Sequence, residues 1–158
     1  FMTWTGTLNR TDNPLVVTAN APHSVVACFA ERLATNATPQ WWLAAHGLTN
    51  YGWDTEALRD SDGDGMPAWQ EYGADTIPTN AGSSLTLWMI TPAPTGTVVG
   101  WKGGTQACQV LERRSDLSAT SEFWRVLHTN QPLTPITNTF LDSNVTNRAH
   151  FYRIRIVR

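Results

Sequence analysis

Acidic side chains recur at alternate positions in one short stretch of this chain, DSDGDGMPAWQE, which covers residues 60–71. Asp60, Asp62 and Asp64 hold the first, third and fifth positions, and Glu71 holds the twelfth. Three carboxylates this close together repel one another, so a folded loop that gathers them needs a cation. The donors are all oxygens, with no His or Cys among them, which favours a hard cation. This is the spacing of a twelve-residue calcium-binding loop, whose last carboxylate contributes two oxygens.

Two further positions of this stretch fit such a loop. Gly65 stands sixth, where the chain must turn sharply, and Met66 stands seventh, where the backbone carbonyl faces the ion. We therefore predict a calcium site whose ligands are Asp60, Asp62, Asp64, Met66 through its carbonyl, and Glu71. The alternative is an acidic, solvated turn that binds nothing.

The eighth position indicates how the loop is used. Pro67 lacks the backbone N–H through which paired loops of this kind bond to each other, so we predict a single, unpaired loop. Pro67 also suits the first turn of a helix, so residues 67–74 should form an exit helix that carries Glu71 back to the ion. A calcium switch needs paired loops and long flanking helices, and we therefore expect the ion to be structural.

The composition limits the classes of function. The 158 residues carry a formal net charge of -2, with no basic patch that would attract nucleic acid or a membrane surface. No apolar run approaches the roughly 20 residues of a membrane span. We expect no nucleic-acid partner and no membrane span. The chain opens directly in strand-like sequence, so we expect a piece of a longer protein, whose upstream modules are its neighbours, or a processed product.

Cysteine and tryptophan each leave alternatives open. Cys28 and Cys108 fit either two separate apolar side chains or one disulfide. Tryptophan can fill the thin core of a small module, or it can form an exposed platform for a glycan, and we favour the core for most of these residues. The chain has eight of them: Trp4, Trp41, Trp42, Trp53, Trp69, Trp88, Trp101 and Trp124.

The chain is predicted to be mainly β, in three segments: 1–35, 36–82 and 83–158. The first is a small β unit with strands over 13–20 and 24–33, and in the second strand Val25, Ala27 and Phe29 share a face. The middle segment holds short helices around the acidic loop. The last segment should be an antiparallel β-sandwich, because Pro, Gly, Asn and Asp separate its strand-like runs at regular intervals. These runs cover 84–90, 96–102, 107–114, 123–128 and 150–158.

The final run alternates between apolar and basic residues. Tyr152, Ile154 and Ile156 fall on one face and the arginines at 153 and 155 on the other, which predicts an exposed arginine stripe on a terminal strand.

The phrase NPLVVTANAPHSVVACFAE, residues 13–31, resembles the end of a bacterial repeat module of the internalin B-repeat type. Such repeats are non-catalytic β units of bacterial surface proteins, often in tandem. The resemblance implies that residues 1–35 are the end of one such module.

A second resemblance covers most of the remaining chain. WWLAAHGLT, DSDGDGMPAWQEYGADTIPTN and the strands that follow resemble the C-terminal region of large secreted proteins of planctomycete- and verrucomicrobia-like bacteria. There, a thrombospondin type 3- or dockerin-like EF-hand calcium loop precedes a fibronectin-like β-sandwich. The resemblance implies an EF-hand-like loop segment at 36–82 and a fibronectin-like domain at 83–158. The sequence departs from the family phrase at Asp75, where the family has Gly, and at Ile77, where it has Asp.

No catalytic motif is present. Ser115, His128 and Asp142 could form a catalytic set, but nothing in the sequence links them. Asp54, Glu56 and Asp60 could form an acid/base pair with a helper, and we interpret them instead as the acidic approach to the ion. We therefore expect a non-catalytic, calcium-stabilised structural or adhesive module on a bacterial cell surface. Self-association through strand edges into a filament is a close variant. The competing expectation is a carbohydrate-binding accessory module of a secreted hydrolase, with a glycan as its partner.

Overall fold

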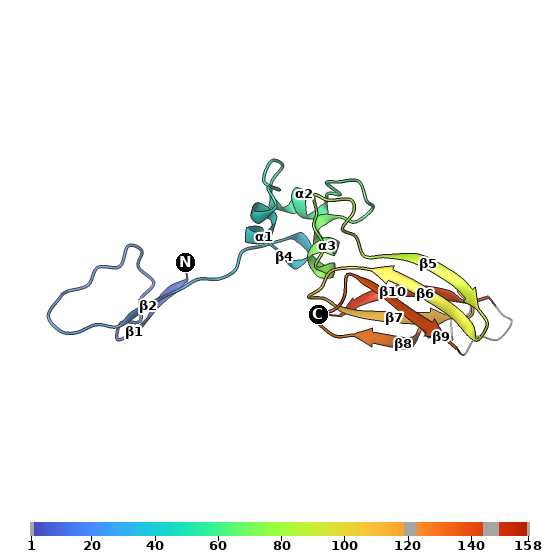
Figure 1. The fold of residues 1–158 in the computed structure, drawn as a ribbon. Helices are drawn as coiled ribbons and strands as arrows, with labels where there is room; N and C mark the ends of the chain where they lie inside the picture. The colour runs from blue at the N-terminus through green and yellow to red at the C-terminus, as the bar shows by residue number, and fades with distance from the viewer. Residues whose placement is uncertain (1, 119–122, 144–148, 158) are drawn as a thin grey trace. The chain divides into compact units, whose positions relative to one another are not determined.

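The computed structural model describes residues 2–118, 123–143 and 149–157 and shows a mainly β protein with a short helical segment (Figure 1). The chain forms two compact units, residues 1–33 and residues 34–158. The predicted fold class is confirmed. The contacts place the acidic loop and the sandwich in one unit, and our finer division into three segments stays a prediction.

The first unit is a β-hairpin without a core. Strand β1 (Thr3–Gly6) pairs antiparallel with β2 (Val25–Cys28). None of its described residues is buried. The strand predicted over 13–20 is wrong, since no strand forms there and Val16 is 81% exposed. The second predicted strand ends early, so Phe29 lies beyond it and is exposed.

Short elements surround the acidic loop at the start of the second unit. They are β3 (Leu33–Ala34), the 3₁₀ turn η1 (Thr35–Ala37), β4 (Thr38–Pro39), α1 (Gln40–Ala45), α2 (Trp53–Leu58) and α3 (Ala68–Ala74). Each α-helix contributes an apolar residue to a small core of Ala34, Leu43, Leu48, Ala57 and Ala68. The alanines at 57 and 68 have minimal side chains, which lets α2 and α3 approach closely on either side of the loop.

Two three-stranded antiparallel sheets pack together in the rest of the unit, as the sequence predicts. One has the order β5 (Thr86–Ala93), β6 (Gly96–Lys102), β9 (Thr137–Asp142), and the other has the order β10 (Phe151–Val157), β7 (Cys108–Arg114), β8 (Arg125–Asn130). Every strand sends at least one apolar side chain into the core between them. The core consists of Val99, Trp101 and Leu111, with Leu87, Leu127, Phe140, Tyr152 and Ile154 against it.

Strand β9 is absent from the predicted runs. Its sequence, TNTFLD, is mostly polar, and only Phe140 packs against the core. Its place in the sheet comes from pairing with β6 in the register Thr97↔Asp142 to Lys102↔Thr137. Such pairing depends on tertiary context, which strand propensity does not capture.

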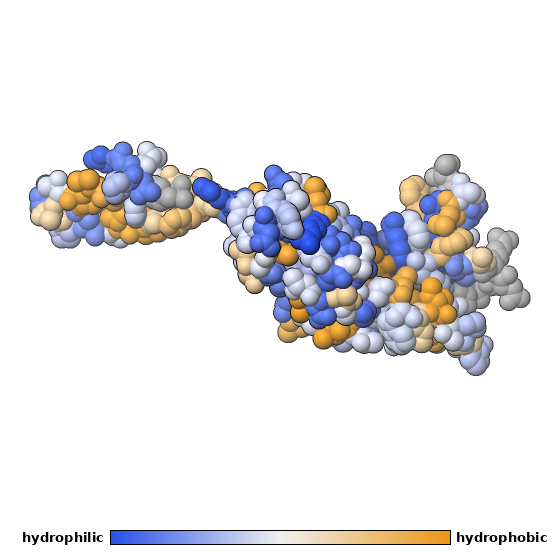
Figure 2. Space-filling view, turned by 90° about the horizontal axis from the view of Figure 1, so that it is seen from above, coloured by the Kyte–Doolittle hydropathy of each residue, from blue (hydrophilic) through white to orange (hydrophobic). Residues whose placement is uncertain are grey.

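The tryptophans are less buried than we expect. Trp101 is fully buried, Trp41 and Trp88 are 60% and 52% exposed, and the other five are half-buried, so the prediction that most fill the core is not confirmed. Trp42 and Trp53 are half-buried against the helical core. Trp41 lies on α1 and Trp88 on β5, so the two exposed rings do not form a platform on one sheet face. Figure 2 shows hydrophobic residues in separate patches among hydrophilic ones.

The two cysteines lie in different units, and both of their alternatives stay predictions. Cys28 lies at the end of β2 and Cys108 at the start of β7.

A buried hydrogen-bond network links the core to the β6–β7 loop. The indole Nε1 of Trp101 donates to Oε1 of Gln109 (2.8 Å), and Nε2 of Gln109 donates to the carbonyl of Gly104 (2.7 Å). The amide of Asn138 donates to the same Gln109 oxygen (3.4 Å). Gln109 is fully buried. Its side-chain amide supplies hydrogen-bond partners that the buried polar groups of Trp101 and Asn138 would otherwise lack.

The arginines of β10 have a specific partner, which the sequence does not reveal. Nε of Arg153 donates to Oε2 of the buried Glu112 (2.7 Å), and Nη2 of Arg155 donates to its Oε1 (3.3 Å). Arg153 also lies 4.2 Å above the ring centroid of Trp124. Burial raises the pKa of Glu112, but the hydrogen bonds and charges of the two arginines outweigh it, and the pKa lies below its usual value. The predicted stripe is therefore a set of ion pairs with the neighbouring strand β7.

Candidate metal centre

The acidic loop lies between α2 and α3, and its two ends are bonded to each other. The N–H of Ala68, the first residue of α3, donates to the carbonyl of Arg59, just before the loop (3.0 Å). Pro67 stands at the N-cap with a φ of -69°, as expected for a residue that opens a helix. The predicted exit helix is confirmed as α3.

Asp60 organises the turn from the first position. Its Oδ1 accepts the N–H of Gly63 (2.8 Å) and its Oδ2 accepts the N–H of Gly65 (2.9 Å). These N–H groups, that of Gly65 first, lower the pKa of Asp60, so this carboxylate stays charged. Gly65 has a φ of 96°, in the region that favours glycine, which is why the sixth position needs this residue.

Asp62 and Asp64 each use one carboxylate oxygen within the loop and leave the other without a partner. Oδ1 of Asp62 accepts the N–H of Asp64 (3.2 Å), and Oδ1 of Asp64 accepts the N–H of Met66 (2.8 Å). The Oδ2 atoms of both residues are buried and have no hydrogen-bond partner in the described chain. Buried carboxylate oxygens of this kind are usually satisfied by an ion or an ordered water.

The three aspartates come together. One carboxylate oxygen from each of Asp60, Asp62 and Asp64 lies within 4.8 Å of the others, a separation at which all three could hold a metal ion. This confirms the convergence that the alternating spacing predicts.

Glu71 reaches the loop from α3 and is fully buried. Its Oε1 accepts the hydroxyl of Thr76 (3.3 Å), and its Oε2 has no partner in the described chain. Burial first, and then the negative charges of Asp62 and Asp64, raise the pKa of Glu71 to about 8. This rise shows that the aspartate charges act on Glu71, although it lies outside the group of three that meets within 4.8 Å. Its role as a ligand stays a prediction.

Met66 connects the loop to the sandwich through its side chain. Its Sδ accepts the N–H of Leu85, one residue before β5 (3.2 Å). The sequence assigns this residue only a carbonyl ligand, and that role stays a prediction. Thr76, the hydroxyl partner of Glu71, is also missed by sequence reasoning, because no loop pattern specifies a residue five positions after the last ligand.

The other carboxylates considered from the sequence have structural partners. Asp54 accepts the N–H and the hydroxyl of Thr35 (2.8 and 2.9 Å). The fully buried Glu56 accepts the N–H groups of Asn50 and Tyr51 (2.8 and 3.1 Å). Both therefore hold the backbone around η1 and α2.

Two members of the set Ser115, His128 and Asp142 also form hydrogen bonds with residues outside that set. Asp142 bonds to Arg113 (2.6 Å) and Tyr152 (3.1 Å), and His128 bonds to Asn130 (2.7 Å).

Comparison of the chain with protein-family models, with curated proteins and with solved structures finds no match. None of the helices in the described residues is long and apolar enough to span a membrane.

Proposed function

We propose that residues 60–71 bind one calcium ion and that this ion holds the unit 34–158 in its folded form. The observation that carries the proposal is a set of three buried carboxylate oxygens without hydrogen-bond partners, on residues of one loop and its exit helix. They are Oδ2 of Asp62, Oδ2 of Asp64 and Oε2 of Glu71. Unpaired buried carboxylates are costly, and a cation among them removes both the repulsion and the missing contacts.

The chemistry of the donors favours calcium. Every predicted ligand atom is an oxygen, from Asp60, Asp62, Asp64, the Met66 carbonyl and Glu71. Oxygen donors select hard cations, and a bidentate Glu at the twelfth position raises the coordination number beyond the octahedron that magnesium prefers.

We assign the ion a structural role. The flanking helices have six and seven residues, too short for the long-helix movement of a calcium switch. The end of α3 is tied to the sandwich, because the N–H of Gly104 donates to the carbonyl of Ala74 (3.2 Å). A calcium ion that binds only the folded form raises the free energy of unfolding by about 2.7 kcal/mol when free calcium is a hundredfold above its dissociation constant.

We further propose that the chain is a non-catalytic structural or adhesive module on a bacterial cell surface, where calcium is plentiful. The sequence resemblances support this setting. Strand order supports self-association as its assembly mode, because β5, β9, β10 and β8 lie at the edges of their sheets among the described strands. Edge strands present backbone groups that another chain can pair with.

Thermal unfolding with light scattering, in calcium and then in chelator, tests the proposal. Chelator should lower the melting temperature of the wild type and have a clearly smaller effect on Glu71→Gln and Asp62→Asn. Asp12→Asn, an exposed acid of the hairpin unit, should respond to chelator like the wild type. If the particles also shrink in chelator, calcium holds an assembly as well as a fold. Equal melting of the wild type in both conditions would contradict the proposal.

A further inference from the structure

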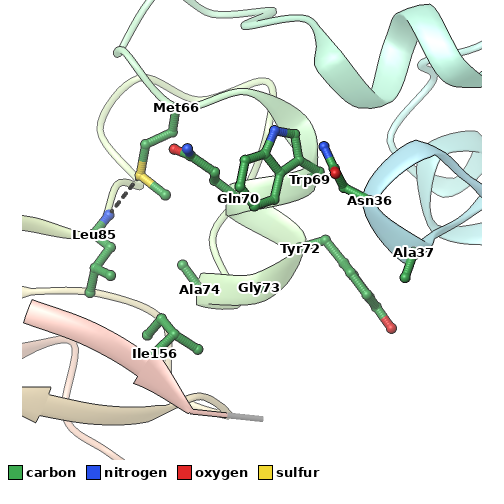
Figure 3. Close-up of a pocket in the computed structure, with 10 residues that line it drawn as sticks. All are labelled: Asn36, Ala37, Met66, Trp69, Gln70, Tyr72, Gly73, Ala74, Leu85 and Ile156. Carbon is green, nitrogen blue, oxygen red and sulfur yellow. Dashed lines mark hydrogen bonds between the residues drawn. The ribbon is translucent and has the colours of Figure 1, made fainter.

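A cavity of about 440 Å³ lies against one face of α3, inside the unit 34–158 (Figure 3). Its volume is in the range of pockets that hold ligands, about 300–1,000 Å³. Trp69, Gln70 and Gly73 line it from α3, and Leu85 and Ile156 line it from the sandwich. The exit helix of the acidic loop therefore forms one wall and the β-sandwich another.

Gly73 lines this cavity without a side chain. It lies inside α3 and its φ is not positive, so the backbone does not require glycine here. A Cβ built at this position meets no atom within 4 Å, so packing does not require it either. Glycine within a helix costs about 1 kcal/mol relative to alanine. Glycine at this position therefore leaves the side-chain space of residue 73 to the cavity, at a cost in helix stability.

The lining selects an uncharged guest with an apolar body. No Asp, Glu, Lys, Arg or His is among the residues that line the cavity, and aliphatic, thioether and aromatic groups make up most of it. The indole N–H of Trp69 and the hydroxyl of Tyr72 are polar groups in this lining. The others are two carboxamides, those of Asn36 and Gln70. Both residues are exposed, and the described chain gives neither side chain a hydrogen-bond partner. Each amide offers both a donor and an acceptor.

The backbone beside the cavity is held in an unfavourable conformation. Asn36 and Ala37 have φ values of 58° and 57°, and Ala37 lacks the polar side chain that stabilises this region. Both residues line the cavity. Such strain clusters at binding sites, where the surrounding structure holds it in place.

We propose that this cavity is a peptide-binding site that takes one apolar side chain of an extended, uncharged segment of a partner protein. The guest side chain sits over Gly73, and the peptide groups on either side bond to the amides of Asn36 and Gln70. Ile156 belongs to β10, which lies at the edge of its sheet among the described strands, so an extended segment can run beside the strand that borders the cavity. Backbone pairing with a pocket for one side chain is an established mode of peptide recognition. The inference does not rest on the ion.

The test is a titration followed by ¹⁵N NMR, with calcium present throughout. The probe is the blocked tripeptide acetyl-Val-Phe-Val-amide. Its comparators are the Ala and Glu versions at the central position and methyl β-glucoside. The expected result is saturable chemical-shift changes at the backbone N–H of Gly73 and the side-chain amide of Gln70. The Ala and Glu peptides should bind with an affinity about tenfold or more weaker than that of the Phe peptide.

Matched variants show whether the cavity itself is used. Gly73→Leu fills the cavity and should weaken binding of the Phe peptide by at least about tenfold. Gly73→Ala should keep the affinity for this peptide within about threefold of the wild type. Asn36→Gly removes an amide without opposing the positive φ and should weaken binding by about threefold or more, as should Gln70→Ala. Gly73→Leu should retain calcium affinity, which shows that it folds and keeps the two proposals separable.

Several results would overturn the inference. They are the absence of shifts at Gly73 and Gln70, binding that survives Gly73→Leu, equal affinity for the Ala peptide, and shifts with the glucoside in place of the peptide.

Discussion

The carboxylate of Asp75 accepts a 2.9 Å hydrogen bond from the backbone N–H of Thr105, thirty residues away in the sequence. The same oxygen accepts the N–H of Gln106 (2.8 Å). Asp75 caps the C-terminal end of α3 with a φ of 58°, so the residue that directly follows the exit helix fixes the β6–β7 loop of the sandwich. A Cβ on Gly104 would collide with the Asp75 carbonyl, so glycine is required at this close approach. These contacts link the acidic loop to the sandwich within the compact unit 34–158.

Asp75→Gly should therefore destabilise the unit 34–158 in saturating calcium. The change removes the acceptor of two backbone N–H groups, but glycine suits the positive φ. The free energy of unfolding measured in urea should therefore fall by about 1–2 kcal/mol. Asp75→Asn keeps one acceptor oxygen and should lose less. Calcium affinity should stay within a few-fold of wild type. A glycine variant as stable as wild type would refute the role of this contact.

The metal-free protein should become less stable as the pH rises from about 4.5 to about 8. The pKa of Glu71 is raised from 4.5 to about 8 in the folded state. Between these values the folded state holds a proton that the unfolded state has released, so stability is full below 4.5 and is lost as the pH approaches 8. Melting temperatures of metal-free wild type and Glu71→Gln across this range measure the effect. Glu71→Gln should lack this pH-dependent loss of stability. Identical pH profiles for the two proteins would contradict the assignment of the loss to Glu71.

Gln109→Leu should destabilise the sandwich by about 2–4 kcal/mol, because the buried Nε1 of Trp101 and the amide of Asn138 lose their common acceptor. Gln106→Leu is the matched control, since Gln106 is exposed and uses its backbone rather than its side chain in the contacts described. Urea unfolding of the two variants should separate them clearly. Equal stability would show that the network contributes little.

Removal of both arginines that bond to Glu112 should cost more than removal of Glu112 itself. Glu112 is buried and the arginine side chains are 44% and 45% exposed, so an unpaired arginine reaches water while an unpaired Glu112 does not. Arg153→Met with Arg155→Met should lose about 2–4 kcal/mol, and Glu112→Leu should lose less. Unfolding free energies at pH 7 measure both. The reverse order would mean that arginine packing, on Trp124 for example, outweighs the charge of Glu112.

The sequence predicts the parts of the site that depend on local spacing. Alternation brings Asp60, Asp62 and Asp64 together, the glycine at 65 adopts the turn, and Pro67 begins the helix that carries Glu71. Contacts made across long separations were not predictable. The pairing that makes a strand of the polar residues 137–142 is one example, and the bond from Asp75 to the β6–β7 loop is another. Asp75 was visible only as a departure from the family phrase, without an indication of its partner.

Calorimetric titration of calcium into the metal-free protein at pH 7 tests the central claim most directly. The account predicts one ion per chain for the wild type, and at least about tenfold weaker binding for Glu71→Gln and Asp62→Asn, because each loses a charged ligand oxygen. It also predicts much weaker binding of magnesium. The absence of calcium binding by the wild type, or equal affinity in both variants, would contradict the assignment of residues 60–71 as the metal site.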